Sequence, residues 1–333
     1  MRNASRDCSK LEIVLSCRGW RSVFVFRLLT IALFAAADPA KALESTSPYA
    51  RGITIGVPIG ALPPPGVYLS NFAIHYSFEI FDGAGRKTGS HIDQFAAGPQ
   101  LLYVPDIPTF LGASYAASIS QPFGYNFLTV PNARPSSQVG LANTVVQPIL
   151  LSWRMSKQIF LGAGLAVYLR DGSYSVVNPA SIARNYASIE PNIAFLYKSN
   201  PLVVSIHAVI DVNWTNPTTR YHSGMAILTD YSMITKFDKL SLGLGGTLTY
   251  QLTNDTVAGV PIRAVSGRNG FGNRAQDFTI GPVVSYDLMG VNVQFTLTQS
   301  LFTRNTAGGT SYFATLSVPL SSKGPSDVVP GPR

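Results

Sequence analysis

The chain has 333 residues, with 25 Lys and Arg, 17 Asp and Glu, 29 Gly and 23 Pro. Charged residues make up 13% of it, about half the share of roughly 25% found in soluble domains, and aromatic residues make up 11%. This composition excludes a disordered protein, a coiled coil and a helical enzyme rich in Glu and Lys.

Residues 1–42 predict a secretory signal peptide. Arginines precede the apolar run Leu28–Ala37, and the A-x-A site Ala40-Lys41-Ala42 predicts cleavage after Ala42. A signal anchor is the alternative, but this run is shorter than the roughly 20 apolar residues that a membrane-spanning helix needs. Seven basic and three acidic residues give this segment half of the net charge of +8. The rest of the chain holds no basic cluster, so no nucleic-acid partner is predicted.

Both cysteines, Cys8 and Cys17, lie in the predicted signal peptide. The mature chain is therefore expected to hold no disulfide, no thiolate metal site and no cysteine nucleophile.

Residues 43–66 predict a polyproline-like lead-in on the periplasmic side. They contain Pro58 and the run Pro63-Pro64-Pro65, and proline cannot donate hydrogen bonds to a sheet. At the other end of the chain, residues 321–333 hold three further prolines and are predicted to be a disordered tail.

Residues 67–320 alternate between apolar and polar side chains. In the first strand Tyr68, Phe72 and Ile74 fall on one face, and Asn71 and His75 fall on the other. Twelve segments follow this period of two. The clearest are 67–80, 111–120, 159–169, 202–214, 240–250, 291–298 and 312–320, and weaker ones lie near 94–104, 142–153, 186–198, 223–236 and 276–287.

The connections between these segments alternate in length. Five are short, and the six long ones are 82–93, 121–141, 171–185, 215–222, 253–275 and 303–310. Short periplasmic turns and long extracellular loops are typical of outer-membrane barrels. Several segments also have the roughly 9–11 residues that a transmembrane strand needs. We therefore predict an all-β fold, a single antiparallel transmembrane barrel of about 12 strands, with a soluble β-sandwich as the alternative.

Catalytic motifs are mostly absent from the sequence. It has no G-x-S-x-G, H-E-x-x-H, P-loop or dinucleotide-binding glycine motif. His222 and Ser223 are adjacent, but neighbouring strand residues point in opposite directions, so a Ser–His dyad would require a sharp turn. No enzyme activity, cofactor or metal site is predicted.

The polar face of the strands is the candidate lining of the lumen. Its predicted members are Asn71, His75, Glu79, Gln147, Glu190, Asn192, His207, Asp211, Asn213 and Gln251. His75 with Glu79, and His207 with Asp211, could form a metal or acid/base pair, or a plain hydrogen-bond network. Twelve strands lie between the filled small barrels and the open large ones, so we expect a narrow or partly plugged pore, with loop 121–141 or 253–275 folded inward.

Short motifs along the chain resemble the outer-membrane family labelled "MetA-pathway of phenol degradation". They are Pro63–Asn71 with Tyr76, Val145–Pro148 with Trp153, Gly172-Ser173-Tyr174, Asn185-Tyr186, Glu190-Pro191, Asn213, Tyr221, Ser223-Gly224, Tyr250-Gln251 and Gly281-Pro282. The resemblance covers roughly residues 60–320. It implies an outer-membrane transporter linked to aromatic degradation, and it carries over no catalytic residue.

The sequence thus predicts a passive outer-membrane channel for small hydrophobic or aromatic, phenol-like compounds. Its expected partners are outer-membrane lipids, the solute and the barrel-assembly machinery. No Lys or Arg ring of the kind that selects anions is visible along the strands. A structural or adhesive barrel is the first alternative and a barrel-type hydrolase the second, because fold alone does not determine function.

Overall fold

The computed structural model describes residues 47–109, 111–262, 273–289 and 291–322. The predicted signal peptide, its cleavage site and nearly all of the predicted tail lie outside these ranges. Within them the chain is all-β, and no helix is long and apolar enough to cross a membrane.

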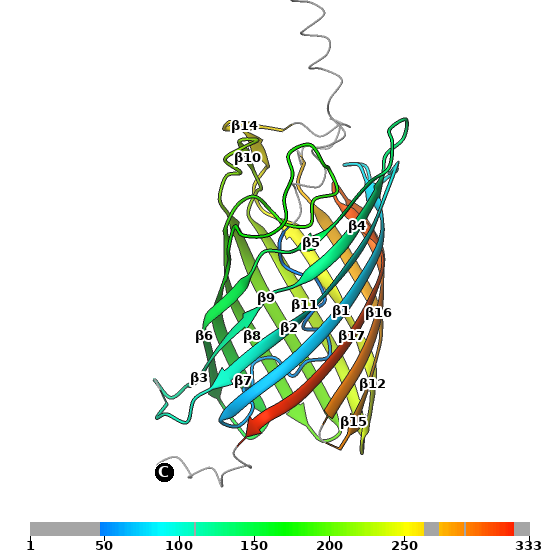
Figure 1. Cartoon of the computed structure of the whole chain (residues 1–333). Coiled ribbons are helices and arrows are strands. Elements are labelled where there is room, and N and C mark those ends of the chain that lie inside the picture. Colours follow the sequence, from blue (N-terminus) through cyan, green and yellow to red (C-terminus); the bar gives the residue numbers. More distant parts are fainter. Residues whose placement is uncertain (1–46, 110, 263–272, 290, 323–333) are drawn as a thin grey trace, which may run out of the picture. The chain divides into compact units, whose positions relative to one another are not determined.

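Twelve antiparallel strands form a closed barrel, as the sequence predicted (Figure 1). In the order of the ring they are β1 (Gly66–Phe81), β17 (Ala307–Ser322), β16 (Val291–Arg304), β15 (Gln276–Leu288), β12 (Leu240–Gln251), β11 (Ala226–Phe237), β9 (Leu202–Asn213), β8 (Ser188–Ser199), β7 (Ile159–Tyr168), β6 (Val145–Arg154), β3 (Ser114–Ser120) and β2 (Lys87–Val104). Closure comes from β1, which pairs with β17 on one side and with β2 on the other.

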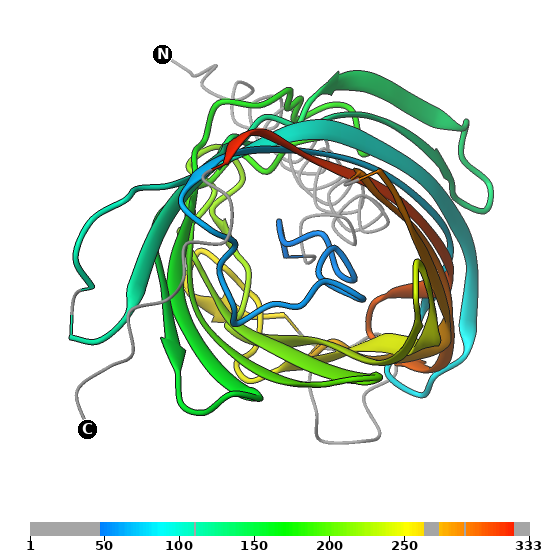
Figure 2. The ribbon, with the colours of Figure 1, turned by 90° about the horizontal axis from the view of Figure 1, so that it is seen from below.

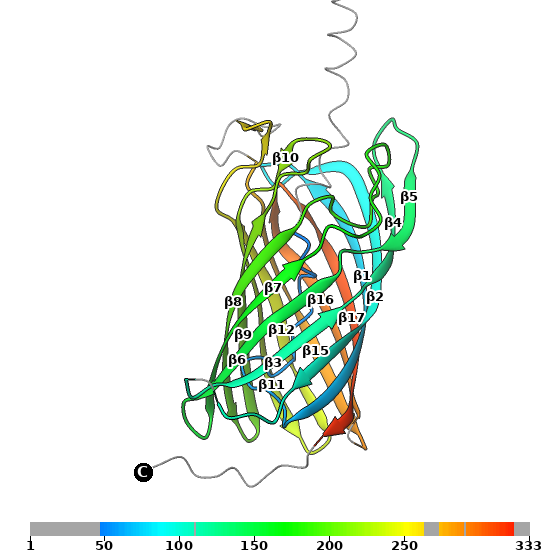
Figure 3. The same ribbon diagram turned by 60° about the vertical axis from the view of Figure 1, so that its left-hand side comes forward.

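Loop 121–141 was predicted to be a long loop, and that prediction is wrong. It forms the hairpin β4 (Phe123–Thr129) and β5 (Ser136–Leu141), which continues the wall outward beside the upper part of β2 (Figure 3). Pro122, which has no N–H, marks the break between β3 and β4. The predicted loops 82–93 and 303–310 are also largely strand, so β1, β2 and β17 reach 16 to 18 residues.

A small second sheet lies among the connections at the long-loop end. It consists of β10 (Tyr221–His222), β13 (Thr256–Val257) and β14 (Val260–Pro261). Outer-membrane barrels carry their long loops on the extracellular side, so this end is extracellular and the short turns are periplasmic.

The outer face of most strands is apolar. Exposed side chains on this face include Ile193, Phe195, Ile206, Ile210, Met233, Leu242, Leu244, Leu248, Val284, Phe295 and Leu297. Aromatic residues accompany them at Trp214, Tyr250, Tyr286 and Tyr312. An apolar band with aromatic residues is the surface that a bilayer requires of a barrel.

Residues 47–65, here called the luminal segment, lie inside the barrel (Figure 2). The Ser152 hydroxyl donates to the Gly60 carbonyl over 2.7 Å, and Gln294 Nε2 donates to the Ile55 carbonyl over 2.6 Å. The prediction of a periplasmic position is therefore wrong for these residues. The prolines keep this segment out of the sheet, so its buried backbone carbonyls accept hydrogen bonds from side chains of the wall instead.

Candidate functional site: the lumen

A cavity of about 960 Å³ lies between the luminal segment and the inner face of the wall. Inward side chains of alternate strand residues line it, and most of them are apolar or amide-bearing. Representative apolar members are Phe72, Phe78, Leu150, Phe160, Leu196 and Ile234, and representative amides are Gln94, Gln100, Asn126, Gln147, Asn192 and Gln294.

Asp230 on β11 is the main anchor of the luminal segment. Its carboxylate accepts hydrogen bonds from the Gly52 N–H over 2.9 Å and from the Thr54 N–H over 3.0 Å. The hydroxyls of Thr54 and Tyr49 donate to the same carboxylate, each over 2.9 Å. Four donors thus compensate one buried charge, and hydrogen bonds to a charged group contribute about 1.5–3 kcal/mol each.

Gly52 can take this position because it has no side chain. Its φ is +94°, and a Cβ there would lie 2.4 Å from the Phe313 ring. Both the backbone conformation and the close approach to β17 require glycine.

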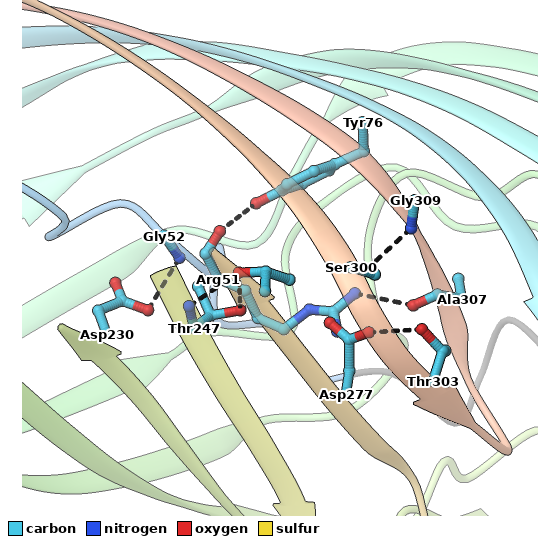
Figure 4. Close-up of polar contacts among 11 residues, drawn as sticks. Arg51, Gly52, Tyr76, Asp230, Thr247, Asp277, Ser300, Thr303, Ala307 and Gly309 are labelled. Atoms are coloured by element: carbon cyan, nitrogen blue, oxygen red, sulfur yellow. Dashed lines mark hydrogen bonds and ion pairs between the residues drawn. The ribbon is translucent and has the colours of Figure 1, made fainter. Parts of the chain in front are cut away.

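Arg51 makes the second anchor (Figure 4). Its Nη1 lies 3.2 Å from Asp277 Oδ2 on β15, and its Nη2 donates to the Ala307 carbonyl over 3.2 Å. The guanidinium also lies over the Phe78 ring, 5.4 Å from its centre. The Tyr76 hydroxyl donates to the Arg51 carbonyl over 2.8 Å, so side chain and backbone are both held.

All charged side chains that line the cavity, among the described residues, are basic. They are Arg51 and Arg184 toward the extracellular half, and Lys198 and Lys236 at the periplasmic ends of β8 and β11. The sequence did not predict this set, because the two lysines lie on different strands and enter the lumen together only through the β8–β9–β11 pairing.

The structure divides the predicted lumen residues into three groups. Gln147, Asn192 and His207 line the cavity. Glu190, Asp211, Asn213 and Gln251 also point inward, but they are buried in the wall or behind the luminal segment. Asn71, His75 and Glu79 lie on the outer face of β1, because Phe72, Tyr76 and Phe78 occupy its inner face.

For these three residues of β1 the predicted face is therefore wrong. Tyr76 and Phe78 on the apolar face of β1 contact Arg51 of the luminal segment, so this face points inward. The polar face then points outward, where His75 lies 3.6 Å from Asp93 and His91 lies 3.2 Å from the same carboxylate. No group of three or more His, Cys, Asp or Glu that could hold a metal occurs in the described part of the chain.

The proposed Ser–His dyad has no support in the geometry. His222 Nδ1 is 3.5 Å from the Thr215 hydroxyl, and the Ser223 side chain hydrogen-bonds Tyr186. Both residues belong to an extracellular cap centred on Asp255. That carboxylate accepts from the Gly224 N–H over 2.7 Å and from Gln251 Nε2 over 2.6 Å, and burial raises its pKa.

Comparisons with known proteins agree with this architecture. One family model, described as "Putative MetA-pathway of phenol degradation", matches residues 78–316. No curated protein matches the chain by sequence.

Among solved structures, the COG4313 outer membrane channel from Pseudomonas putida F1 has a TM-score of 0.67 at 13% identity, covering 78% of this chain and 97% of that one. The β domain of the Bordetella autotransporter BrkA has a TM-score of 0.47 at 11% identity and covers 78% and 100%. The transport unit of the autotransporter AIDA-I from Escherichia coli has a TM-score of 0.48 at 9% identity, covering 77% of this chain and 90% of that one.

Proposed function

Because this chain belongs to the family described as "Putative MetA-pathway of phenol degradation", and its barrel encloses a large cavity, we propose that it is an outer-membrane channel for passive uptake of small hydrophobic or aromatic compounds. The P. putida relative is itself named an outer membrane channel.

The lining of the cavity is the observation that carries the proposal. Aromatic rings at Phe72, Tyr76 and Phe160 line it together with amides such as those of Gln147 and Asn192. Ligand cavities for small organic molecules are mostly apolar with a few placed polar groups, and their volumes run from about 300 to 1,000 Å³. A phenol-like ring with one hydroxyl fits this chemistry, since the ring contacts the apolar side chains and the amides bond the hydroxyl.

The basic side chains of the lining add a preference by charge. Lys198 and Lys236 are exposed at the periplasmic end of the lumen, and the lining includes no carboxylate among the described residues. Rings of Lys or Arg favour anions in pores. We therefore infer that aromatic anions, such as phenolates and aromatic carboxylates, pass more readily than aromatic cations.

The test is current blockade in a planar bilayer holding the folded barrel. Benzoate and phenol are expected to reduce the ion current in a saturable manner, whereas glucose at the same concentration is not. Phe160→Ala should weaken the block several-fold, because this ring lines the cavity. Phe295→Ala is the matched control, since Phe295 faces outward and is 59% exposed. Currents that neither aromatic solute changes would overturn the proposal.

A further inference from the structure

Three side chains on neighbouring strands form a short chain of hydrogen bonds at the wall of the cavity. Gln100 on β2 donates from Nε2 to the Ser118 hydroxyl of β3 over 3.4 Å, and that hydroxyl donates to Gln147 Oε1 on β6 over 2.6 Å. Ser118 is only 6% exposed, whereas both glutamines line the cavity. A buried serine therefore holds two amides beside each other at the surface that a solute meets.

The serine determines which polar atoms the two amides present. A hydroxyl carries one hydrogen, so Ser118 donates to one amide and accepts from the other. In the described part of the chain, Gln100 Oε1 and Gln147 Nε2 make no hydrogen bond. The pair thus offers the lumen one free acceptor and one free donor, both next to the same serine oxygen.

An irregularity of the wall lies at the residue that presents the donor. The register of β6 shifts against β3 next to Ser118, and it shifts against β7 between Val146 and Ile149. Both shifts fall at Gln147 and Pro148, and proline interrupts a ladder because it has no N–H. A β-bulge re-aims the side chain that it carries, and bulges are over-represented next to functional sites.

Apolar residues beside the two amides can accommodate an aromatic ring. Phe72 on β1 pairs with Gly98, two residues along β2 from Gln100. Leu150 on β6 is three residues from Gln147, and both Phe72 and Leu150 line the cavity. A ring whose polar group bonds the amides therefore has apolar side chains to contact on both of these strands.

We propose that Gln100, Ser118 and Gln147 form the site that recognises the hydroxyl group of a phenolic solute. This inference rests on the proposed function and names the solute group and the residues that bind it. A phenol hydroxyl donates to Gln100 Oε1 and accepts from Gln147 Nε2, so it satisfies both free groups at once. An aromatic ether or carboxylate can only accept, so it leaves the Gln100 carbonyl unpaired. Sites built to bond a hydroxyl discriminate against analogues that lack it.

Current blockade at pH 7 by phenol and by anisole, its methyl ether, tests the site. Phenol is uncharged at this pH, because a phenolic hydroxyl has a pKa of about 10. In wild type, phenol should block roughly twofold to tenfold more strongly than anisole, the range expected for one hydrogen bond. Gln100→Met removes the acceptor, so the phenol block should fall to the anisole level. Gln147→Met removes the donor, so the block by both solutes should weaken.

Gln94→Met is the matched control. Gln94 lines the cavity from the same strand as Gln100, but its amide bonds Asn126 instead. This variant should keep the wild-type ratio of phenol block to anisole block. Ser118→Ala should lose the discrimination, and Ser118→Thr, which keeps the hydroxyl, should retain it. Heat-modifiable gel mobility confirms that each variant is folded.

Benzoate separates failure of this site from failure of the proposed function. Its block should stay nearly unchanged in Gln100→Met, because a carboxylate cannot donate to the carbonyl that is removed. The site is overturned, and the channel is not, if phenol and anisole block wild type equally. The same holds if Gln94→Met alters their ratio as much as Gln100→Met does. If neither phenol nor benzoate changes the current, the proposed function fails and this site fails with it.

Discussion

Arg51 Nη1 in the luminal segment lies 3.2 Å from Asp277 Oδ2 in the wall, and these residues are 226 positions apart in the chain. The carboxylate is almost fully buried, and its other oxygen accepts from the Thr303 hydroxyl over 2.7 Å. The pair therefore joins the start of the described chain to its last third, and it does so where water cannot compensate a lost charge.

Breaking this pair from one side should destabilise the barrel strongly. Removing one partner of a buried ion pair costs about 3–5 kcal/mol, because the other charge remains unpaired. Arg51→Met and Asp277→Leu are each expected to lower the unfolding midpoint in urea, followed by heat-modifiable gel mobility. The double variant should lose less than the sum of the two. Strict additivity would contradict a direct interaction.

Asp230 should control how firmly the luminal segment stays in the lumen. Asp230→Ala removes the acceptor for Gly52, Thr54 and Tyr49 together. The expected result is a larger and noisier single-channel conductance than wild type in planar bilayers. Asp93→Asn is the control, because Asp93 lies on the outer face of β2 beside His91. Equal conductance in wild type and Asp230→Ala would mean that the segment does not limit the current.

The periplasmic lysines should determine ion selectivity. Lys198→Gln with Lys236→Gln is expected to move the reversal potential in a salt gradient toward cation permeation by several millivolts or more. Glu190→Gln and Asp211→Asn should leave it nearly unchanged, since neither residue lines the main cavity. If the two carboxylate variants shifted the reversal potential more than the lysine variant did, the conducting path would run along β8 and β9 instead.

The extracellular cap should become more stable as the pH falls. Burial raises the pKa of Asp255, so the folded state binds a proton more tightly than the unfolded state. Stability from this group is then greatest below the unfolded pKa of about 3.9, and it declines as the pH rises toward the folded pKa. Thermal unfolding between pH 3.5 and 7 should show a smaller decline for Asp255→Asn than for wild type.

Asp82 supplies a control of the opposite sign. Hydrogen bonds from Arg86 and Ala84 lower its pKa, so its contribution is present above the unfolded pKa and is lost as the pH falls. Wild type should therefore lose the stability that Asp82 contributes when the pH falls, and Asp82→Asn should lose less on acidification. If Asp255→Asn and Asp82→Asn changed the dependence of thermal stability on pH in the same direction, this assignment would be contradicted.

The alternation of apolar and polar residues in the sequence predicts most of the barrel correctly, but it does not predict which face of β1 points inward. Segments such as 202–214 and 240–250 have apolar residues toward lipid and polar ones inward, as predicted. In β1 the same pattern has the reverse orientation, because Tyr76 and Phe78 meet the luminal segment rather than the bilayer. A period of two identifies the two faces of a strand, but the environment of each face depends on what fills the lumen.

The luminal segment was the feature that the sequence concealed. Its prolines correctly excluded a strand, but Gly52 and Asp230 carry no local sign of each other, since 178 residues separate the donor from its acceptor. The length of β1, β2 and β17 was likewise underestimated. The polar residues at the extracellular ends of these strands have the composition of a loop, although the pairing of β1 with β17 and β2 continues through them.

The position of the luminal segment has a consequence for the order in which the protein is built. The segment precedes β1, yet its two charged anchors, Asp230 on β11 and Asp277 on β15, follow their partners in it by 178 and 226 residues. The segment cannot reach these anchors until most of the wall exists. Yet β17 must still join β1 to close the ring around it. A luminal segment bound in the lumen therefore indicates that the barrel is complete and in register. An unfinished wall, or one with a shifted register, would not bring Asp230 and Asp277 together.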